Sequence, residues 1–450
     1  METSMCRFRL FFCACFGCIA LFSWSEDAVQ DGMKFKFNCD VYVRGDFDRS
    51  KQVSQADMYT GVPFDGGLAY ARTSFGFSSS SFDMVFKPRV SVDGNAAASV
   101  DALFVRYKPF EFLTLRAGRF SPEVGSSLAF PCIDWFRPLT TPQDMIDGTR
   151  FSSSSDTLFE VTVASHGLSL GFAFSPFMPL YDRTPYGSSL FPMKDIRSQY
   201  TDLLGNKSPL DSAAWMSGNT DPFNWVPSYG IDASFRARKL TCTGYYFDGI
   251  DRSPAIVRRT RYLMGFSNAY ALEMDYAVSR LRSFGLSLKS SLGPATVWLD
   301  GDYTQGRLYP VEGLYDHFGE RTWQSVKAVS TISWTSGCKL NVVDRFVSAS
   351  AEWKYTYYPD TSDLISQRFL AQAVYGMLDI TLAPVRSVFE VSCAYVLQDG
   401  SYLLSYSLET TSRELKSVRL GVSFPSTAPD TDFGQFAGYG KAFVSCAVRY

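Results

Sequence analysis

The final twelve residues, Tyr439 to Tyr450, read YGKAFVSCAVRY. In an extended strand, alternate side chains point to opposite faces. One face here collects Ala442, Val444, Cys446, Val448 and Tyr450. The other carries Lys441, Ser445 and Arg449. We expect this two-sided strand with its terminal aromatic residue to close a sheet, and the alternative is an ordinary last strand of a soluble β-protein.

Composition restricts how this chain could cross a membrane. The 450 residues have a mean hydropathy of -0.06 and 20% are charged. Beyond the N-terminus, no run reaches the roughly 18 apolar residues of a spanning helix, so strands must make any crossing. Aromatic residues, at 16%, suit the interfacial girdles of a membrane barrel. The net charge of -2 shows no bias toward nucleic acid as a partner.

The N-terminus predicts a signal peptide over residues 1–25. Arg7 and Arg9 precede an apolar core from Leu10 to Phe22, and Ser23-Trp24-Ser25 forms a small-x-small cleavage site. A lipoprotein cysteine at Cys18 is the alternative. The six later cysteines are scattered without metal-ligand spacing, so we expect neither a disulfide framework nor a metal site. Cys39, Cys393 and Cys446 lie among the apolar positions of their strands, so we expect them to act as small hydrophobic residues.

Period-two alternation dominates the mature chain, as in Phe35, Phe37, Cys39 and Val41 against Lys34, Lys36, Asn38 and Asp40. It predicts an all-β fold: a transmembrane antiparallel up-and-down β-barrel of about 18 strands, with 16 as the alternative. An even count fits single-chain bacterial barrels, and closure removes unpaired strand edges. Residues 26–450 are expected to form one barrel domain.

Asp101 to Gly125 is the most specific internal segment: two strands joined by a turn placed at Lys108-Pro109-Phe110, then LTLRAGRF, which ends at Phe120. This LxLRxGxF pattern and the closing strand resemble the larger Gram-negative porins, including the phosphate-selective group. The resemblance implies export to the outer membrane of a diderm bacterium and allows for a homotrimer. It also implies that barrel-assembly machinery reads a C-terminal signal at Val444, Cys446, Val448 and Tyr450.

Three long polar segments interrupt the strands. Residues 121–156 follow the fifth expected strand, where the resemblance implies a constriction loop folded into the barrel; an external loop is the alternative. Its charged candidates are Asp134, Arg137, Asp144, Asp147 and Arg150. Residues 175–227 and 248–282 are expected to be external loops. Within the latter, Tyr270 to Leu281 fits a short helix or another strand.

Charge on the expected inner face is mostly basic. Arg106 and Arg116 join the constriction candidates, and the wall candidates are Lys34, Lys36, Lys87, Arg89, Arg236, Lys289, Lys354 and Arg419. A basic wall in a narrow pore concentrates an anion-favouring potential. The alternative is that inward acidic residues neutralise these charges in ladders. Fewer acidic residues are expected to face inward: Asp40, Asp83, Asp232, Asp300, Asp302, Glu352, Glu390 and Glu409.

Catalytic motifs are not evident. The chain has two histidines, His166 and His317, and alternation along a strand predicts that the side chain of adjacent Ser165 points away from His166. We therefore predict no enzyme, cofactor or metal. The favoured function is a channel in contact with outer-membrane lipid that passes small hydrophilic solutes, with weak anion preference. The alternatives are a transporter for hydrophobic substrates, similar to fatty-acid transporters, and a surface adhesin or antigen.

Overall fold

The computed structural model describes residues 34–48, 64–93, 95–122, 125–133, 136, 145, 156–177, 199–201, 207–215, 225–263, 269–311, 325–343, 346–359, 370–382, 386–411, 417–426, 431–433 and 439–449. The predicted signal peptide lies outside them. The described residues contain an 18-stranded sheet. Its strands are β1 (Lys34–Asp48), β2 (Phe64–Ser78), β3 (Phe82–Asp93), β4 (Asn95–Phe110), β5 (Leu113–Phe120), β6 (Asp156–Ser165), β7 (Leu168–Phe177), β10 (Trp225–Ala237), β11 (Leu240–Ile250), β14 (Arg280–Leu292), β15 (Ala295–Pro310), β16 (Val326–Val343), β17 (Val347–Tyr357), β18 (Gln372–Leu382), β19 (Ser387–Val396), β20 (Tyr402–Thr410), β21 (Ser417–Pro425) and β22 (Tyr439–Arg449).

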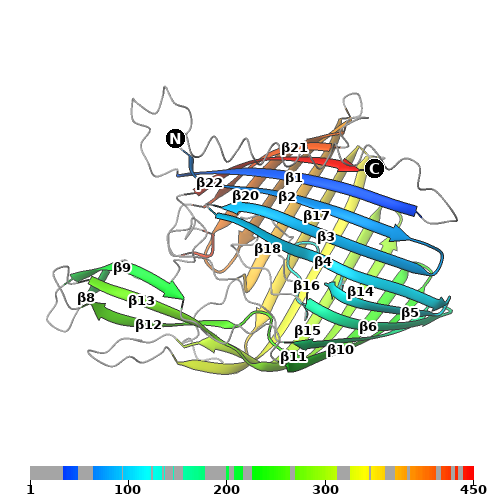
Figure 1. Cartoon of the computed structure of the whole chain (residues 1–450), viewed down its shortest axis with the longest axis horizontal. Helices are drawn as coiled ribbons and strands as arrows, with labels where there is room; N and C mark the ends of the chain where they lie inside the picture. Colours follow the sequence, from blue (N-terminus) through cyan, green and yellow to red (C-terminus); the bar gives the residue numbers. More distant parts are fainter. Residues whose placement is uncertain are drawn as a thin grey trace.

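Strands that follow one another in this sheet pair antiparallel, and the first also pairs with the last (Figure 1). In that pairing Val43 lies opposite Val444, and Cys39 lies opposite Val448. Hydrogen bonding therefore runs around a complete ring, which leaves no barrel strand with an unpaired edge. The predicted antiparallel barrel of about 18 strands is confirmed.

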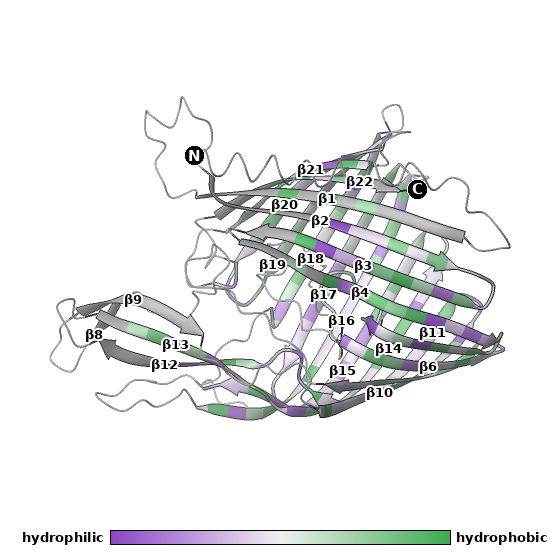
Figure 2. Ribbon diagram, viewed as in Figure 1, coloured by the Kyte–Doolittle hydropathy of each residue, from purple (hydrophilic) through white to green (hydrophobic). Residues whose placement is uncertain are grey.

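Alternation of side chains gives the barrel two chemically different faces. Hydrophobic and hydrophilic residues follow one another along the strands in Figure 2. On β6, Phe159, Val161 and Val163 are exposed apolar residues, and Glu160 occupies an alternate position between the first two. The same pattern recurs along β14 and β15. An outer apolar face is what a strand needs to meet lipid, because the backbone groups are already satisfied within the sheet.

Short turns join the strands at one end of the barrel, among them Ser79–Ser81, His166–Gly167, Arg238–Lys239 and Gly293–Pro294. The turn after β4 was placed wrongly from the sequence. Strand β4 continues through Phe110, and the turn falls at Glu111–Phe112. Pro109 lies one residue before the strand end, next to an irregularity in the pairing of β4 with β5, which is how the strand accommodates its missing N–H.

The opposite end of the barrel carries a second, four-stranded sheet. It contains β8 (Gln199–Thr201), β9 (Lys207–Trp215), β12 (Ala255–Leu263) and β13 (Ala269–Ala277). Strands β9 and β13 come from different insertions and pair in parallel, so the two predicted external segments join each other. The sheet projects from the end away from the short turns (Figure 1). Of the two structures considered for Tyr270 to Leu281, the strand is the one present, in β13.

No helix among the described residues is long and apolar enough to span a membrane.

Candidate functional site

The interior face of the barrel wall can be identified from exposure. On β15, Leu299 is 45% exposed, whereas the alternate residues Asp300 and Asp302 are buried. On β17, Trp353 is exposed and its neighbours Glu352 and Lys354 are buried. Because apolar side chains occupy the outer face, these charged residues point into the barrel.

Residues 125–133, which follow β5, contact strands far around the ring. The N–H groups of Ser126 and Ser127 donate to Asp300 Oδ2 on β15, at 2.7 and 2.9 Å. The N–H of Gly125 donates to the hydroxyl of Tyr245 on β11, at 3.3 Å. The segment therefore lies inside the barrel. It contacts strands that are neither neighbours of β5 in the sheet nor close to it in the sequence.

Glu352 holds the next part of the same segment. Its carboxylate accepts the N–H groups of Leu128 at 2.5 Å, Ala129 at 3.0 Å and Phe130 at 2.6 Å. It also accepts the indole N–H of Trp298 at 3.2 Å. Two wall carboxylates thus satisfy consecutive backbone donors of a segment that has no strand partner, and such charge-assisted bonds are stronger than neutral ones.

Apolar contacts hold the second half of this segment. Phe130 belongs to a buried cluster on β18 to β20, with Tyr375 at a ring-centroid distance of 6.3 Å. Ile133 and Phe136 belong to another cluster, where Phe136 meets Phe247 of β11 at 5.2 Å. Hydrogen bonds from residues 125–130 and apolar contacts from Ala129 onward together hold the segment in one position.

Cys132 lies in the second cluster and is buried. Burial raises the pKa of its thiol strongly, and the nearby carboxylates of Asp300 and Asp302 raise the pKa further. Thr335 and Lys354 act in the opposite direction but more weakly. The thiol is therefore protonated at neutral pH. The six described cysteines are all free thiols.

A row of four charged residues crosses the wall formed by β3 to β6. Arg106 lies opposite Asp83 and also opposite Arg116, which lies opposite Glu160. Arg106 Nη2 is 2.6 Å from Asp83 Oδ2, and Arg116 Nη1 is 3.6 Å from Glu160 Oε2. The two arginines are adjacent on the inner face, each with an acidic residue on its far side.

Aromatic rings hold Arg116 in place. Its guanidinium carbon is 4.0 Å from the ring centre of Phe104 and 3.8 Å from that of Phe120. Arg116 is the first of the two arginines of LTLRAGRF, and Phe120 is its aromatic residue. The glycine of that motif, Gly118, has φ +130°, and a Cβ there would lie 2.2 Å from the carbonyl oxygen of Leu103. The motif therefore marks a close approach of β4 to β5, and the side chain of Arg116 packs beside it.

A second group of charges lies on β2 to β4. Asp101 Oδ2 is 2.6 Å from Arg72 Nε, and Asp101 Oδ1 is 3.6 Å from Arg89 Nε. On β19 and β21, Arg419 Nη2 is 2.7 Å from Glu390 Oε1. Several of the basic wall residues therefore have acidic partners on the same face.

The other candidates are spread around the wall. Lys87 and Lys354 lie on β3 and β17, and Lys354 is buried; Arg236 and Lys289 are exposed on β10 and β14, near the short turns. Val444 and Cys446 lie in β22, which pairs with β1. The side chains of Lys34, Lys36 and Val448, and all of Asp134, Arg137, Asp144, Asp147, Arg150 and Tyr450, lie outside the described residues.

Sequence reasoning left out three carboxylates of the inner face: Asp101, Glu160 and Asp379. Glu160 and Asp379 each adjoin an exposed apolar residue, Phe159 and Leu378, so strict counting from those residues would have found them. Asp101 lies at a register shift between β3 and β4, so counting from exposed Leu103 would have placed it on the outer face. Nothing in the local sequence indicated that Asp300 and Glu352 would bind backbone N–H groups of residues 126–130.

Ser165 and His166 contradict the expectation that their side chains diverge. Ser165 Oγ lies 2.7 Å from His166 Nδ1. His166 is in a turn with φ 48°, so strand alternation does not apply to it. Both residues are exposed at the end of the barrel, and the described residues show no carboxylate bonded to this histidine. The pair lacks the third group that orients a catalytic base.

The sequence matches no protein-family model and no curated protein at a significant level. Among solved structures the chain is similar to OccD3 (OpdP) of Pseudomonas aeruginosa, at 8% identity and a TM-score of 0.50, covering 93% of this chain and 91% of that one. It is also similar to OccK2 (OpdF) of the same organism, at 9% identity and a TM-score of 0.47, covering 93% and 97%. At such identities the likeness concerns the fold alone.

Proposed function

We propose that this chain forms a water-filled channel in the outer membrane of a diderm bacterium, through which small hydrophilic solutes diffuse. The observation that carries the proposal is the chemistry of the two faces: charged and polar side chains line the inside of a ring whose outside is apolar. Such an interior lowers the cost of passage for hydrated solutes. No cofactor or covalent step enters this mechanism.

Residues 125–133 narrow this channel in the proposal. They lie in the interior of the barrel, where the carboxylates of Asp300 and Glu352 accept hydrogen bonds from their backbone N–H groups. The rest of the expected constriction loop contains the five charged candidates. We include it in the proposal only because it continues this segment along the chain.

Arg106 and Arg116 form the arginine pair of the pore wall in this proposal. Acidic partners offset much of their charge, so we propose a weak anion preference rather than a strong one. The adjacent guanidinium groups still give anions a local site, because Asp83 and Glu160 lie on the outer sides of the pair.

The charged interior argues against transport of hydrophobic substrates, which would need an apolar path. A surface role has one supporting observation, the four-stranded sheet at the end of the barrel. Protease treatment of intact cells tests that role: cleavage within residues 178–224 or 251–279 shows that this sheet faces outward.

Planar-bilayer conductance of the refolded full-length protein tests the channel proposal. Stable open steps are expected, with a reversal potential under a salt gradient that slightly favours anions. A barrel that inserts and shifts in electrophoresis on heating, yet never conducts, would contradict the proposal.

A further inference from the structure

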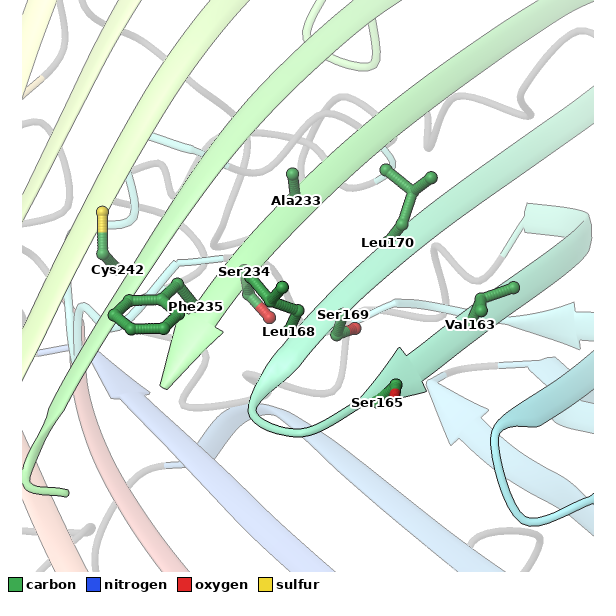
Figure 3. Close-up of a pocket in the computed structure, with 9 residues that line it drawn as sticks. All are labelled: Val163, Ser165, Leu168, Ser169, Leu170, Ala233, Ser234, Phe235 and Cys242. Atoms are coloured by element: carbon green, nitrogen blue, oxygen red, sulfur yellow. The ribbon is translucent and has the colours of Figure 1, made fainter. Parts of the chain in front are cut away.

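An apolar groove lies on the outer face of the barrel, close to the short turns. It has a volume of about 440 Å³ and crosses β6, β7, β10 and β11 (Figure 3). Its apolar walls come from Val163, Leu168, Leu170, Ala233, Phe235 and Cys242. The groove is separate from the interior face that carries the proposed channel.

Side-chain size explains why the surface is hollow here. Small Ala233 lies opposite Leu170, and Cys242 lies opposite Phe235. Large side chains therefore stand around two small ones on neighbouring strands. Leu168 and Leu170 remain 60% and 55% exposed, since no described part of the chain covers them. In a membrane, this hollow faces acyl chains.

Two cations stand at the turn end of the groove. Arg238 and Lys239 form the turn that follows Phe235 and Ala237, and both are exposed. The neighbouring turn is in contact, because the N–H of Arg236 donates to the carbonyl of Gly167 at 2.7 Å. Neither Arg238 nor Lys239 forms an ion pair with any residue that the structure describes.

The surrounding turns leave this end of the groove positively charged. The turn on one side, Gly293–Pro294, carries no charge. On the other side, the adjacent turn contains His166. The turn beyond it, between β4 and β5, contains Glu111. Arg236 and Lys289 add further exposed positive charge on the inner face near the same rim.

We propose, building on the outer-membrane channel above, that this groove binds one acyl chain of an anionic phospholipid, whose phosphate group Arg238 and Lys239 hold. Two features support this occupant together: the groove lies on the lipid-facing side, and its cations match a negatively charged headgroup at the interface. Arginine and lysine both bind phosphate, and basic residues beside membrane-embedded apolar surface recognise anionic lipid headgroups.

Native mass spectrometry of the refolded full-length protein tests the proposal. With dioleoyl-phosphatidylglycerol, we expect a one-to-one adduct that survives detergent removal, and roughly tenfold less adduct with dioleoyl-phosphatidylcholine. Equal retention of the two lipids overturns the proposal. Displacement of the adduct by millimolar inorganic phosphate alone also overturns it, because the site would then bind free phosphate rather than lipid.

Two variants separate the headgroup from the groove. The double variant Arg238→Gln, Lys239→Gln should lose roughly tenfold in phosphatidylglycerol adduct. Ala233→Leu should lower the adduct of both lipids, because it fills the hollow at an exposed position without changing charge. The matched control is Arg386→Gln, at an exposed turn residue with φ 49° away from the groove. An equal loss in the control overturns the proposal, as does a barrel dimer in place of the lipid adduct.

Conductance of the same preparations distinguishes the two proposals. Lost lipid binding with normal conductance in the Arg238→Gln, Lys239→Gln variant is expected. Conducting wild-type protein that retains no anionic lipid overturns the lipid site and leaves the channel standing. Non-conducting wild-type protein that retains the lipid supports the site and contradicts the channel.

Discussion

Glu352 on β17 accepts the backbone N–H of Phe130 at 2.6 Å, across 222 positions of the chain. A carboxylate of the barrel wall thereby satisfies a donor of a segment that lies inside the ring. Leu128 and Ala129 donate to the same carboxylate, so one side chain fixes three consecutive residues. This relationship places residues 125–133 inside the barrel.

Removing that carboxylate should release the segment. In Glu352→Ala, three N–H groups lose their acceptor, at roughly 1–3 kcal/mol for each group left without a partner. We expect noisier open steps and passage of larger neutral sugars in liposome-swelling assays.

Asp379→Ala is the matched control for that variant. It also removes a wall carboxylate, but one that bonds Ser348 rather than residues 125–133. Unchanged conductance and size limit in Glu352→Ala, or an equal change in the control, would show that Glu352 does not hold a pore-narrowing segment.

Arg116→Ala should weaken any anion preference. Coulomb's law gives about 0.4 kcal/mol for one charge about 10 Å from an ion in water, or roughly a twofold change in the permeability ratio. The reversal potential under a salt gradient measures this change. It should shift toward the reversal potential of a cation-selective pore. Arg116→Lys retains the charge and should behave like the wild type. A reversal potential that is the same in all three proteins contradicts a role for this arginine in selectivity.

Gly118→Ala should destabilise the barrel by about 3 kcal/mol or more, because it combines an unfavourable φ with a clash against the backbone of Leu103. Urea titration monitored by heat-dependent electrophoretic mobility measures the loss. Gly244→Ala is the control, since a Cβ there meets nothing within 4 Å. Equal stability of the two variants would mean that β4 and β5 do not approach each other so closely.

Cys132 should resist thiol reagents in the folded barrel. Burial raises the pKa of its thiol, so the reactive thiolate is scarce at pH 7 to 9, and access is blocked as well. In a variant whose only cysteine is Cys132, a membrane-permeant maleimide should leave the folded barrel unmodified. Denaturation in detergent should make the same thiol reactive. Rapid labelling of Cys132 in the native barrel would show that its segment is open to solvent.

Strand alternation made the barrel predictable from sequence. Each strand has one face against lipid and one against water, and this repeats every two residues whatever the strand's partner. The pattern also placed Arg106 and Arg116 on the inner face. It failed at Lys108 to Phe110, where the strand continued past the expected turn, and at Ser165 and His166, where a left-handed turn residue interrupts the alternation.

The sequence by itself therefore determined the class of fold, the strand count to within two and the face of most charged residues, because these depend on local periodicity. Only the tertiary structure decided which residues far apart in the sequence contact each other. Asp101 pairs with Arg72, Glu352 binds residues 128–130, and β9 joins β13. These contacts depend on how the ring closes and on where a loop lies within it, and no period along the chain encodes either.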